Sequence, residues 1–174
     1  FYTEKVTDMS YLFSGCENLK EIDLSRFDTK NVQNMAHMFD SCVSITSLSM
    51  ADFDTSWSKD FSYMFNNCRN LETLNMTKFD TRIVADMSYM FSNCTSLKEL
   101  DFKSFETGSV TSMKFMFSSC TSITSLDLSS FNTQKCKDFT SMFLNTENIL
   151  VKVTRSNSSN LIEAIKEYVK LEII

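Results

Sequence analysis

Apolar residues along the chain follow two alternating patterns, one typical of a helix and one typical of a short strand. The first has apolar spacings of 3, 4 and 3 residues, as on one face of a helix, at Val6, Met9, Phe13 and Cys16. The second, Ile22-Asp23-Leu24, alternates apolar and polar residues as a half-buried β-strand does. Each pair of patterns therefore predicts a short helix followed by a short strand.

The two patterns recur with a constant period of 26 residues. The cysteines that keep this period are Cys16, Cys42, Cys68, Cys94 and Cys120. The phenylalanine rows are Phe13, Phe39, Phe65, Phe91, Phe117 and Phe143, and Phe27, Phe53, Phe79, Phe105 and Phe131. A threonine row follows at Thr29, Thr55, Thr81, Thr107 and Thr133. A unit this short cannot bury its apolar face alone, so the copies must stack.

Stacking of such units predicts an α/β repeat fold. We expect a curved solenoid of 26-residue units, each with a short helix and a short parallel β-strand, with the strands on one side. The repeats span residues 1–145. Their register places Phe1 on the second phenylalanine row, so the chain begins in mid-repeat, and we expect it to be a C-terminal fragment of a longer array.

The period breaks after Phe143, where a different segment begins. Thr146 stands at the next cysteine position, residues 149–153 predict a longer strand, and residues 155–160 predict a loop. An amphipathic helix over residues 161–169 and a last strand over 171–174 are expected to follow. We interpret residues 146–174 as a C-terminal strand-helix cap that hides the open end of the stack.

Composition narrows the possible partners. The net charge of −5 argues against nucleic acid, since phosphate binding needs a basic surface. No run approaches the ~20 apolar residues of a membrane span, so we expect no direct membrane insertion in this segment. His37 is the only histidine and the two glycines form no phosphate loop. We therefore predict no enzyme, no catalytic residue and no cofactor.

Three residue rows raise chemical alternatives. The cysteines are interpreted as free, buried structural thiols, with disulfides or a metal as the alternative. The methionine rows are interpreted as core filling rather than a Cu(I) site, because Leu12, Phe61 and Phe139 replace methionine in them. The acidic row is interpreted, with the threonines, as capping the next helix, and Ca²⁺ binding is the alternative. That row comprises Asp28, Asp54, Asp80, Glu106 and Asn132.

The strings MSYMFSNCTSLKELDFKSFET (87–107) and MFSSCTSITSLDLSSFNT (116–133) resemble the BspA-like leucine-rich repeats of microbial surface proteins and lipoproteins. The resemblance implies a leucine-rich-repeat solenoid in a protein of the cell surface or one that is secreted. It also implies adhesion, or binding of a host, neighbouring-cell or matrix protein, without catalysis.

Two surfaces are candidates for binding a protein partner. The concave sheet is the usual binding surface of a solenoid. Its outward residues are Glu21, Asp23, Ser47, Ser49, Thr73, Asn75, Glu99, Asp101, Ser125 and Asp127. A row of rings on the convex side is either a partner anchor or an edge-to-face structural ladder. It comprises Tyr11, His37, Tyr63, Tyr89 and Phe115.

The leading hypothesis is a protein-recognition or adhesion module that binds through the concave sheet. Two other functions stay open. Free thiols also suit an intracellular scaffold that assembles other proteins, since the cytosol keeps thiols reduced. In the second of these functions, the repeats are a rigid spacer that presents another domain.

Overall fold

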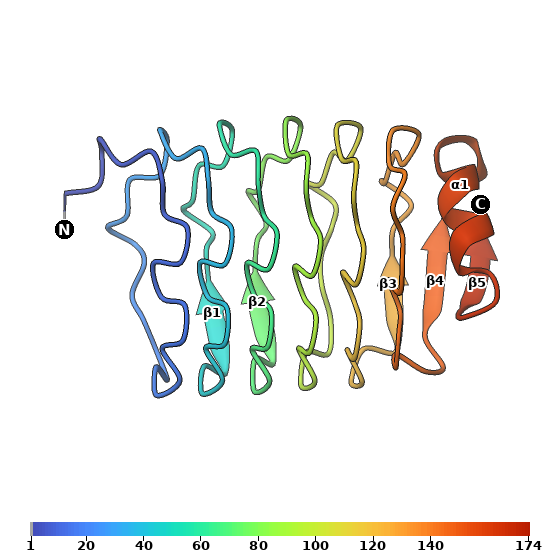
Figure 1. Ribbon diagram of the computed structural model, residues 1–174, viewed down its shortest axis with the longest axis horizontal. Coiled ribbons are helices and arrows are strands. Elements are labelled where there is room, and N and C mark those ends of the chain that lie inside the picture. The colour runs from blue at the N-terminus through green and yellow to red at the C-terminus, as the bar shows by residue number, and fades with distance from the viewer. Residues whose placement is uncertain (1) are drawn as a thin grey trace.

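The computed structural model describes residues 2–174, so Phe1 and its predicted place on the phenylalanine row lie outside the described residues. Successive 26-residue units lie side by side in chain order, and the two ends of the chain lie at opposite ends of the molecule (Figure 1). The elements are β1 (Ser47–Ser49), β2 (Thr73–Asn75), β3 (Ser125–Asp127), β4 (Leu150–Val153), α1 (Arg155–Ile165) and β5 (Lys170–Ile173).

The strands of neighbouring units pair in parallel. Leu48 of β1 lies opposite Leu74 of β2, so residues at the same position of successive units are paired. A second parallel sheet has the order β3-β4-β5. The strands begin one residue earlier than predicted. No strand forms at residues 22–24 or 100–102, because no backbone hydrogen bonds join these residues to neighbouring units within the described chain. The prediction of a strand in every unit was therefore wrong for these two.

The predicted short helices do not form, and α1 is the only α-helix among residues 2–174. The segments expected to be helical are runs of tight turns, and we call them turn segments. They comprise residues 8–16, 34–42, 60–68, 86–94, 112–120 and 138–146. Within one, the Asp40 N–H donates to the His37 carbonyl at 3.1 Å. Two residues in each have φ near +60°, as at His37 (58°) and Ser41 (62°), and this interrupts any helix.

Alternate residues of each turn segment bond to the next unit. The N–H groups of His37 and Phe39 donate to the carbonyls of Ser62 and Met64, both at 2.9 Å. These backbone donors are therefore unavailable for the bonds of an α-helix. Parallel backbone pairs between Asn34 and Asp60 and their copies continue the contact through six units.

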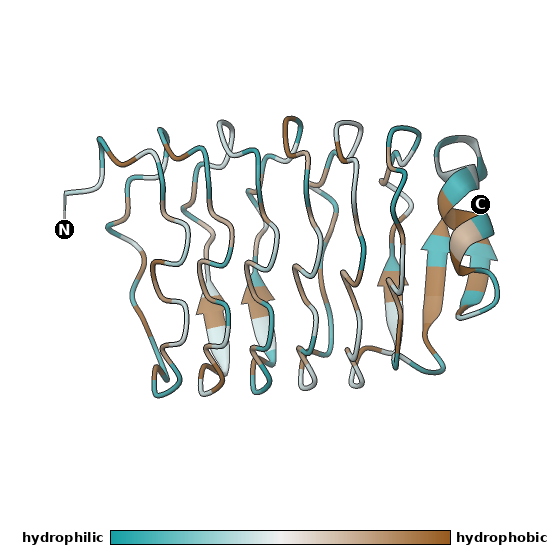
Figure 2. Ribbon diagram, in the orientation of Figure 1, coloured by the Kyte–Doolittle hydropathy of each residue, from teal (hydrophilic) through white to brown (hydrophobic). Residues whose placement is uncertain are grey.

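The apolar stripe predicts the core correctly even though the helix is absent. Val32, Met35, Phe39 and Cys42 are all fully buried. Rings of the first phenylalanine row stack from unit to unit, with centroids 5.1–6.0 Å apart from Phe13 to Phe143. Apolar residues recur at corresponding places in successive units (Figure 2). One continuous core therefore runs along the stack.

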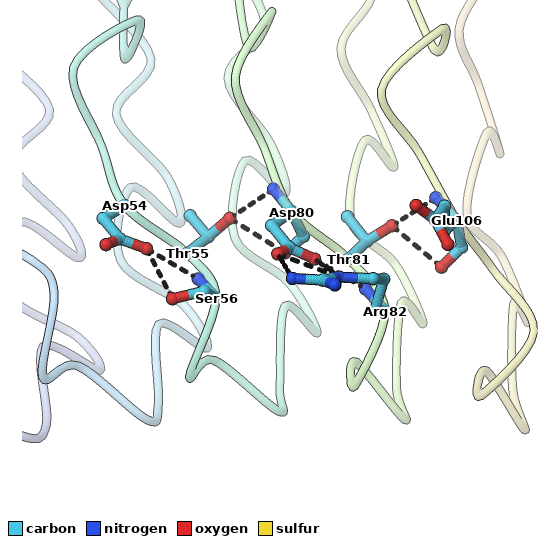
Figure 3. A network of polar contacts seen from close by, with 7 residues as sticks. All are labelled: Asp54, Thr55, Ser56, Asp80, Thr81, Arg82 and Glu106. Atoms are coloured by element: carbon cyan, nitrogen blue, oxygen red, sulfur yellow. Dashed lines mark hydrogen bonds and ion pairs between the residues drawn. The ribbon is translucent and has the colours of Figure 1, made fainter.

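Buried threonines link each unit to the next (Figure 3). The Thr55 hydroxyl donates to the Asp80 carbonyl at 2.9 Å and accepts from the Asp80 N–H at 2.8 Å. The acidic side chains cap their own turns instead, and the Asp54 carboxylate accepts from the Ser56 N–H at 3.0 Å. The predicted capping of a following helix was therefore wrong, since no helix follows and the threonine side chain bonds across the interface.

The C-terminal segment departs from the repeat. Strand β4 lies within the predicted range, and β5 begins one residue earlier than expected and pairs with β4 in parallel. Helix α1 includes residues 155–160, which were predicted to be a loop. Its helical dihedral angles are interrupted at Ser158, whose hydroxyl donates to the Phe131 carbonyl at 2.8 Å. Within residues 2–174 no helix has the length and apolar character needed to cross a bilayer.

Candidate functional site

The outward residues of the strand side are all exposed, as predicted. Between them lies a hollow of about 640 Å³, which we call the strand-face hollow. Predicted residues that line it are Ser47, Ser49, Thr73, Asn75, Glu99, Asp101 and Asp127. Glu21, Asp23 and Ser125 are exposed but do not line it. The structure therefore brings seven of the ten predicted residues together on one concave surface.

Further residues of the strand-face hollow were not in the predicted set. They are Leu48, Leu74, Leu100, Phe102 and Ser130. The alternating pattern assigns the leucines and Phe102 to the core, and Leu74 and Leu100 are only partly buried. Lys103 and Ser129 also line the hollow, and the alternation predicts both as outward-facing residues, since they follow Asp101 and Asp127 by two positions.

The acidic side chains of the hollow are held by local hydrogen bonds. The Asp101 carboxylate accepts from the Lys103 N–H at 3.0 Å, and the Asp127 carboxylate accepts from the Ser129 N–H at 3.0 Å. Hydrogen bonds from the side chain and backbone of Ser129 lower the pKa of Asp127 below its ordinary value. The Asn75 side chain makes the same bond to the Thr77 N–H. These groups are therefore oriented before any partner arrives.

The strand-face hollow has an acidic character. Glu99, Asp101 and Asp127 contribute carboxylates, and Lys103 is the one basic residue that lines it. The Nζ atom of Lys103 lies 3.5 Å from Oδ2 of Asp101, and the Nζ atom of Lys152 lies 3.5 Å from Oδ2 of Asp127. The surface combines exposed hydroxyl, amide and carboxylate groups with partly buried leucines, a mixture suited to a polar protein surface.

The aromatic row forms a continuous stack. The ring centroids from Tyr11 to Phe115 are 4.3, 4.4, 4.4 and 4.7 Å apart, with interplanar angles of 7–11°. The predicted edge-to-face packing was therefore wrong. Each inner ring has both faces covered by its neighbours, so only ring edges reach solvent, and Tyr11 at the end is 59% exposed. This arrangement leaves no inner ring face to stack on a partner.

Stacking also offsets a local strain. Each residue of the row has φ between 55° and 60°, a left-handed conformation that costs a residue with a side chain ~1–2 kcal/mol. A stacked aromatic pair contributes about 0.5–1.5 kcal/mol beyond its buried area. His37 fits between Tyr11 and Tyr63, and its Nδ1 lies 2.8 Å from the Asp40 carboxylate. The row is therefore a structural ladder in this fold.

The six cysteines are free, but Cys16 is exposed, so the prediction that the whole row is buried was wrong for this residue. Four buried thiols donate to the carbonyl of a phenylalanine in the preceding unit, each at 3.1 Å. These are Cys42, Cys68, Cys94 and Cys120, and Thr146 makes the equivalent bond to Phe117 at 2.6 Å. Burial raises the pKa of Cys42 and Cys120 to about 12 and that of Cys136 to about 11. These thiols therefore serve as small apolar residues whose S–H groups are hydrogen-bonded to backbone carbonyls.

Thiol labelling is expected to distinguish one cysteine from the others. Cys16 is exposed, whereas the other five are buried, so iodoacetamide at about pH 8 should modify one of the six cysteines in the native chain. In denaturant all six should react, and Cys16→Ser should abolish the native signal. Mass spectrometry of the labelled chain measures this. Rapid native modification of a second cysteine would show that the repeat core opens.

The Ca²⁺ and Cu(I) alternatives both require a cluster of metal-ligating side chains. Among residues 2–174, no group of three His, Cys, Asp or Glu side chains is arranged to hold a metal ion. Within the acidic row, the carboxylates of Asp28, Asp54 and Asp80 each accept a hydrogen bond from the N–H two residues later. Methionines of the middle units, such as Met64 and Met90, are fully buried in the core.

The stacked units, shared core and repeated inter-unit bonds define a tandem-repeat protein. A family model described as "Mycoplasma protein of unknown function, DUF285" matches residues 1–99 and again residues 59–170. The chain belongs to this family. The two matches overlap, as expected where one model fits the same repeated unit in more than one register. No curated protein and no solved structure matches the chain.

Proposed function

We propose that this chain is a non-catalytic protein-recognition or adhesion module that binds a partner protein through the strand-face hollow. The observation that carries the proposal is a concave, polar surface whose residues change from unit to unit while the core rows stay constant. Variable side chains on a constant frame give each unit its own contribution to recognition.

The proposal also covers the class of repeat and the location of the protein. We infer that the stack is a leucine-rich-repeat solenoid of the BspA-like class, carried by a protein of the cell surface or one that is secreted. The repeat strings at 87–107 and 116–133 and the parallel pairing of β1 with β2 support it. The acidic character of the hollow favours a partner with a polar, basic surface.

A charge-neutralised variant tests this function. E99Q/D101N/D127N removes three negative charges from the hollow and keeps the turn-capping oxygens, as Asn75 does naturally. We expect it to bind a purified matrix protein about tenfold more weakly than the native chain does, a loss of ~1.4 kcal/mol. Biolayer interferometry against fibronectin, laminin and fibrinogen, at two salt concentrations, measures the change.

A matched control removes the same charge elsewhere. E17Q/D28N/D54N also neutralises three carboxylates, and two of these cap turns outside the hollow. It should bind as the native chain does. Equal affinity of the two variants, with circular dichroism unchanged, would contradict binding through the hollow. An isolated chain that binds none of the probes would favour the spacer function.

A further inference from the structure

The last turn segment has a row of unpaired backbone donors. Between this segment and the one before it, alternate N–H groups of the earlier segment donate to alternate carbonyls of the last one. These are Met113 to Asp138, Phe115 to Thr140, Phe117 to Met142 and Ser119 to Leu144, at 2.8, 2.9, 2.9 and 2.7 Å. The equivalent donors of the last segment are Phe139, Ser141, Phe143 and Asn145. Their N–H groups have no hydrogen-bond partner among residues 2–174.

The row is open because residues 147–174 do not form a further turn segment. From β4 the chain passes through α1 directly to β5 (Figure 1). The end of α1 lies beside the last turn segment and leaves a groove of about 720 Å³ between them. All four residues with unpaired N–H groups line this groove, which we call the end groove.

The end groove has an apolar floor and an amphipathic rim. Met142, Phe143 and Ile165 line it and are at most 5% exposed. Leu144 and Tyr168 also line it, and they are 47% and 70% exposed. A partner that covers the apolar floor also covers these backbone N–H groups, and covering them is costly unless the partner accepts their hydrogen bonds.

We propose that the end groove binds a segment of a partner polypeptide folded as a run of tight turns, whose alternate carbonyls accept hydrogen bonds from Phe139, Ser141, Phe143 and Asn145. The contacts between the other turn segments define the shape and the chemistry required: a run of tight turns with carbonyls at every second residue over a span of seven residues. Exposed Leu144 and Tyr168 then pack on apolar side chains of the segment. This is recognition by adding one more turn segment to the open end of the stack, analogous to strand addition at a sheet edge, and it uses a different surface from the strand-face hollow.

A peptide from the chain itself is a suitable probe. Residues 86–94, Asp-Met-Ser-Tyr-Met-Phe-Ser-Asn-Cys, bond in this manner to the segment before them, through the carbonyls of Asp86, Ser88, Met90 and Ser92. A fluorescein-labelled peptide with serine at the cysteine position should bind the full 174-residue chain saturably in fluorescence polarisation. In amide NMR spectra, the N–H signals of residues 139, 141, 143 and 145 should shift downfield and exchange more slowly when the peptide is added.

Matched variants on α1 locate the site. Ala164 lines the end groove and is exposed, so Ala164→Trp should fill the groove and weaken peptide binding at least tenfold. Ser159 is exposed on the same helix outside the groove, so Ser159→Trp should not change binding. E99Q/D101N/D127N should also bind the peptide normally, which separates this site from the strand-face hollow.

Three results would overturn the proposal. They are the absence of saturable binding up to 1 mM peptide, equal binding by Ala164→Trp and the native chain, and slow exchange of the four amides in the free chain at every concentration. Slow exchange that grows with protein concentration and is lost in Ala164→Trp would assign the groove to a second copy of the chain, and would also overturn the proposed partner segment.

Discussion

Above about pH 9 the protein is expected to unfold over a narrow pH range, because its buried cysteines ionise only in the unfolded chain. The folded pKa values of Cys42 and Cys120 are raised to about 12, and burial also raises those of Cys68, Cys94 and Cys136. At a pH between the unfolded and the folded pKa of a thiol, the unfolded chain binds fewer protons than the folded chain does. The free energy of unfolding therefore falls by ~1.4 kcal/mol per pH unit for each thiol.

The effect is large because five thiols act together. Five buried thiols together lower the free energy of unfolding by about 7 kcal/mol per pH unit, while a domain has roughly 5–15 kcal/mol in total. The contribution of these thiols to stability is fully present below about pH 8.5 and is lost as the pH rises toward 12. We expect a midpoint between about pH 9.5 and 11, measured by circular dichroism after transfer to each pH.

A threonine variant provides the control. Thr146 already occupies the cysteine row and makes the same hydrogen bond to the preceding unit. Replacing Cys42, Cys68, Cys94 and Cys120 with threonine removes four ionisable groups and keeps a donor at each position. The midpoint should rise by about one pH unit or more relative to the native chain. An unchanged midpoint would assign alkaline unfolding to other groups, such as Tyr63, whose pKa burial raises.

The sequence predicted which side chains face the core but not the backbone that directs them there. The 3-4-3 spacing of Val32, Met35, Phe39 and Cys42 indicates only that these side chains point to the same side of the backbone. A run of tight turns can point side chains at this spacing to one side, as a helix does. A signal for turns was present at the second left-handed position of each unit. Gly15, Ser41, Asn67, Asn93, Ser119 and Asn145 occupy it, and glycine and asparagine favour that conformation.

The candidate site was predictable where it depends on local alternation alone. Exposure of Ser47, Thr73 and Asp101 follows from their place between inward residues. The outline of the hollow was not predictable, because Phe102 and the leucines contribute to it from positions that the pattern assigns to the core. The end groove depends on the position of α1 beside the last turn segment, which no repeat pattern describes.

Replacing a buried threonine of the inter-unit row with valine is expected to destabilise the fold by about 2–4 kcal/mol. The Thr81 hydroxyl donates to the Glu106 carbonyl at 3.0 Å and accepts from the Glu106 N–H at 2.8 Å (Figure 3). Valine has nearly the same shape, so Thr81→Val keeps the packing and leaves both backbone groups unpaired. Urea unfolding followed by circular dichroism should show a lower midpoint with an unchanged slope.

Two further variants separate the hydrogen bonds from the side-chain shape. Thr81→Ser keeps the hydroxyl and should recover most of the loss, because a serine hydroxyl both donates and accepts. Thr77→Val changes an exposed threonine in the same unit and should stay within ~0.5 kcal/mol of the native chain. If Thr81→Val matched Thr77→Val, the threonine row would contribute nothing to the inter-unit contact. Cohesion of the stack would then rest on the phenylalanine core and the backbone bonds of the turn segments.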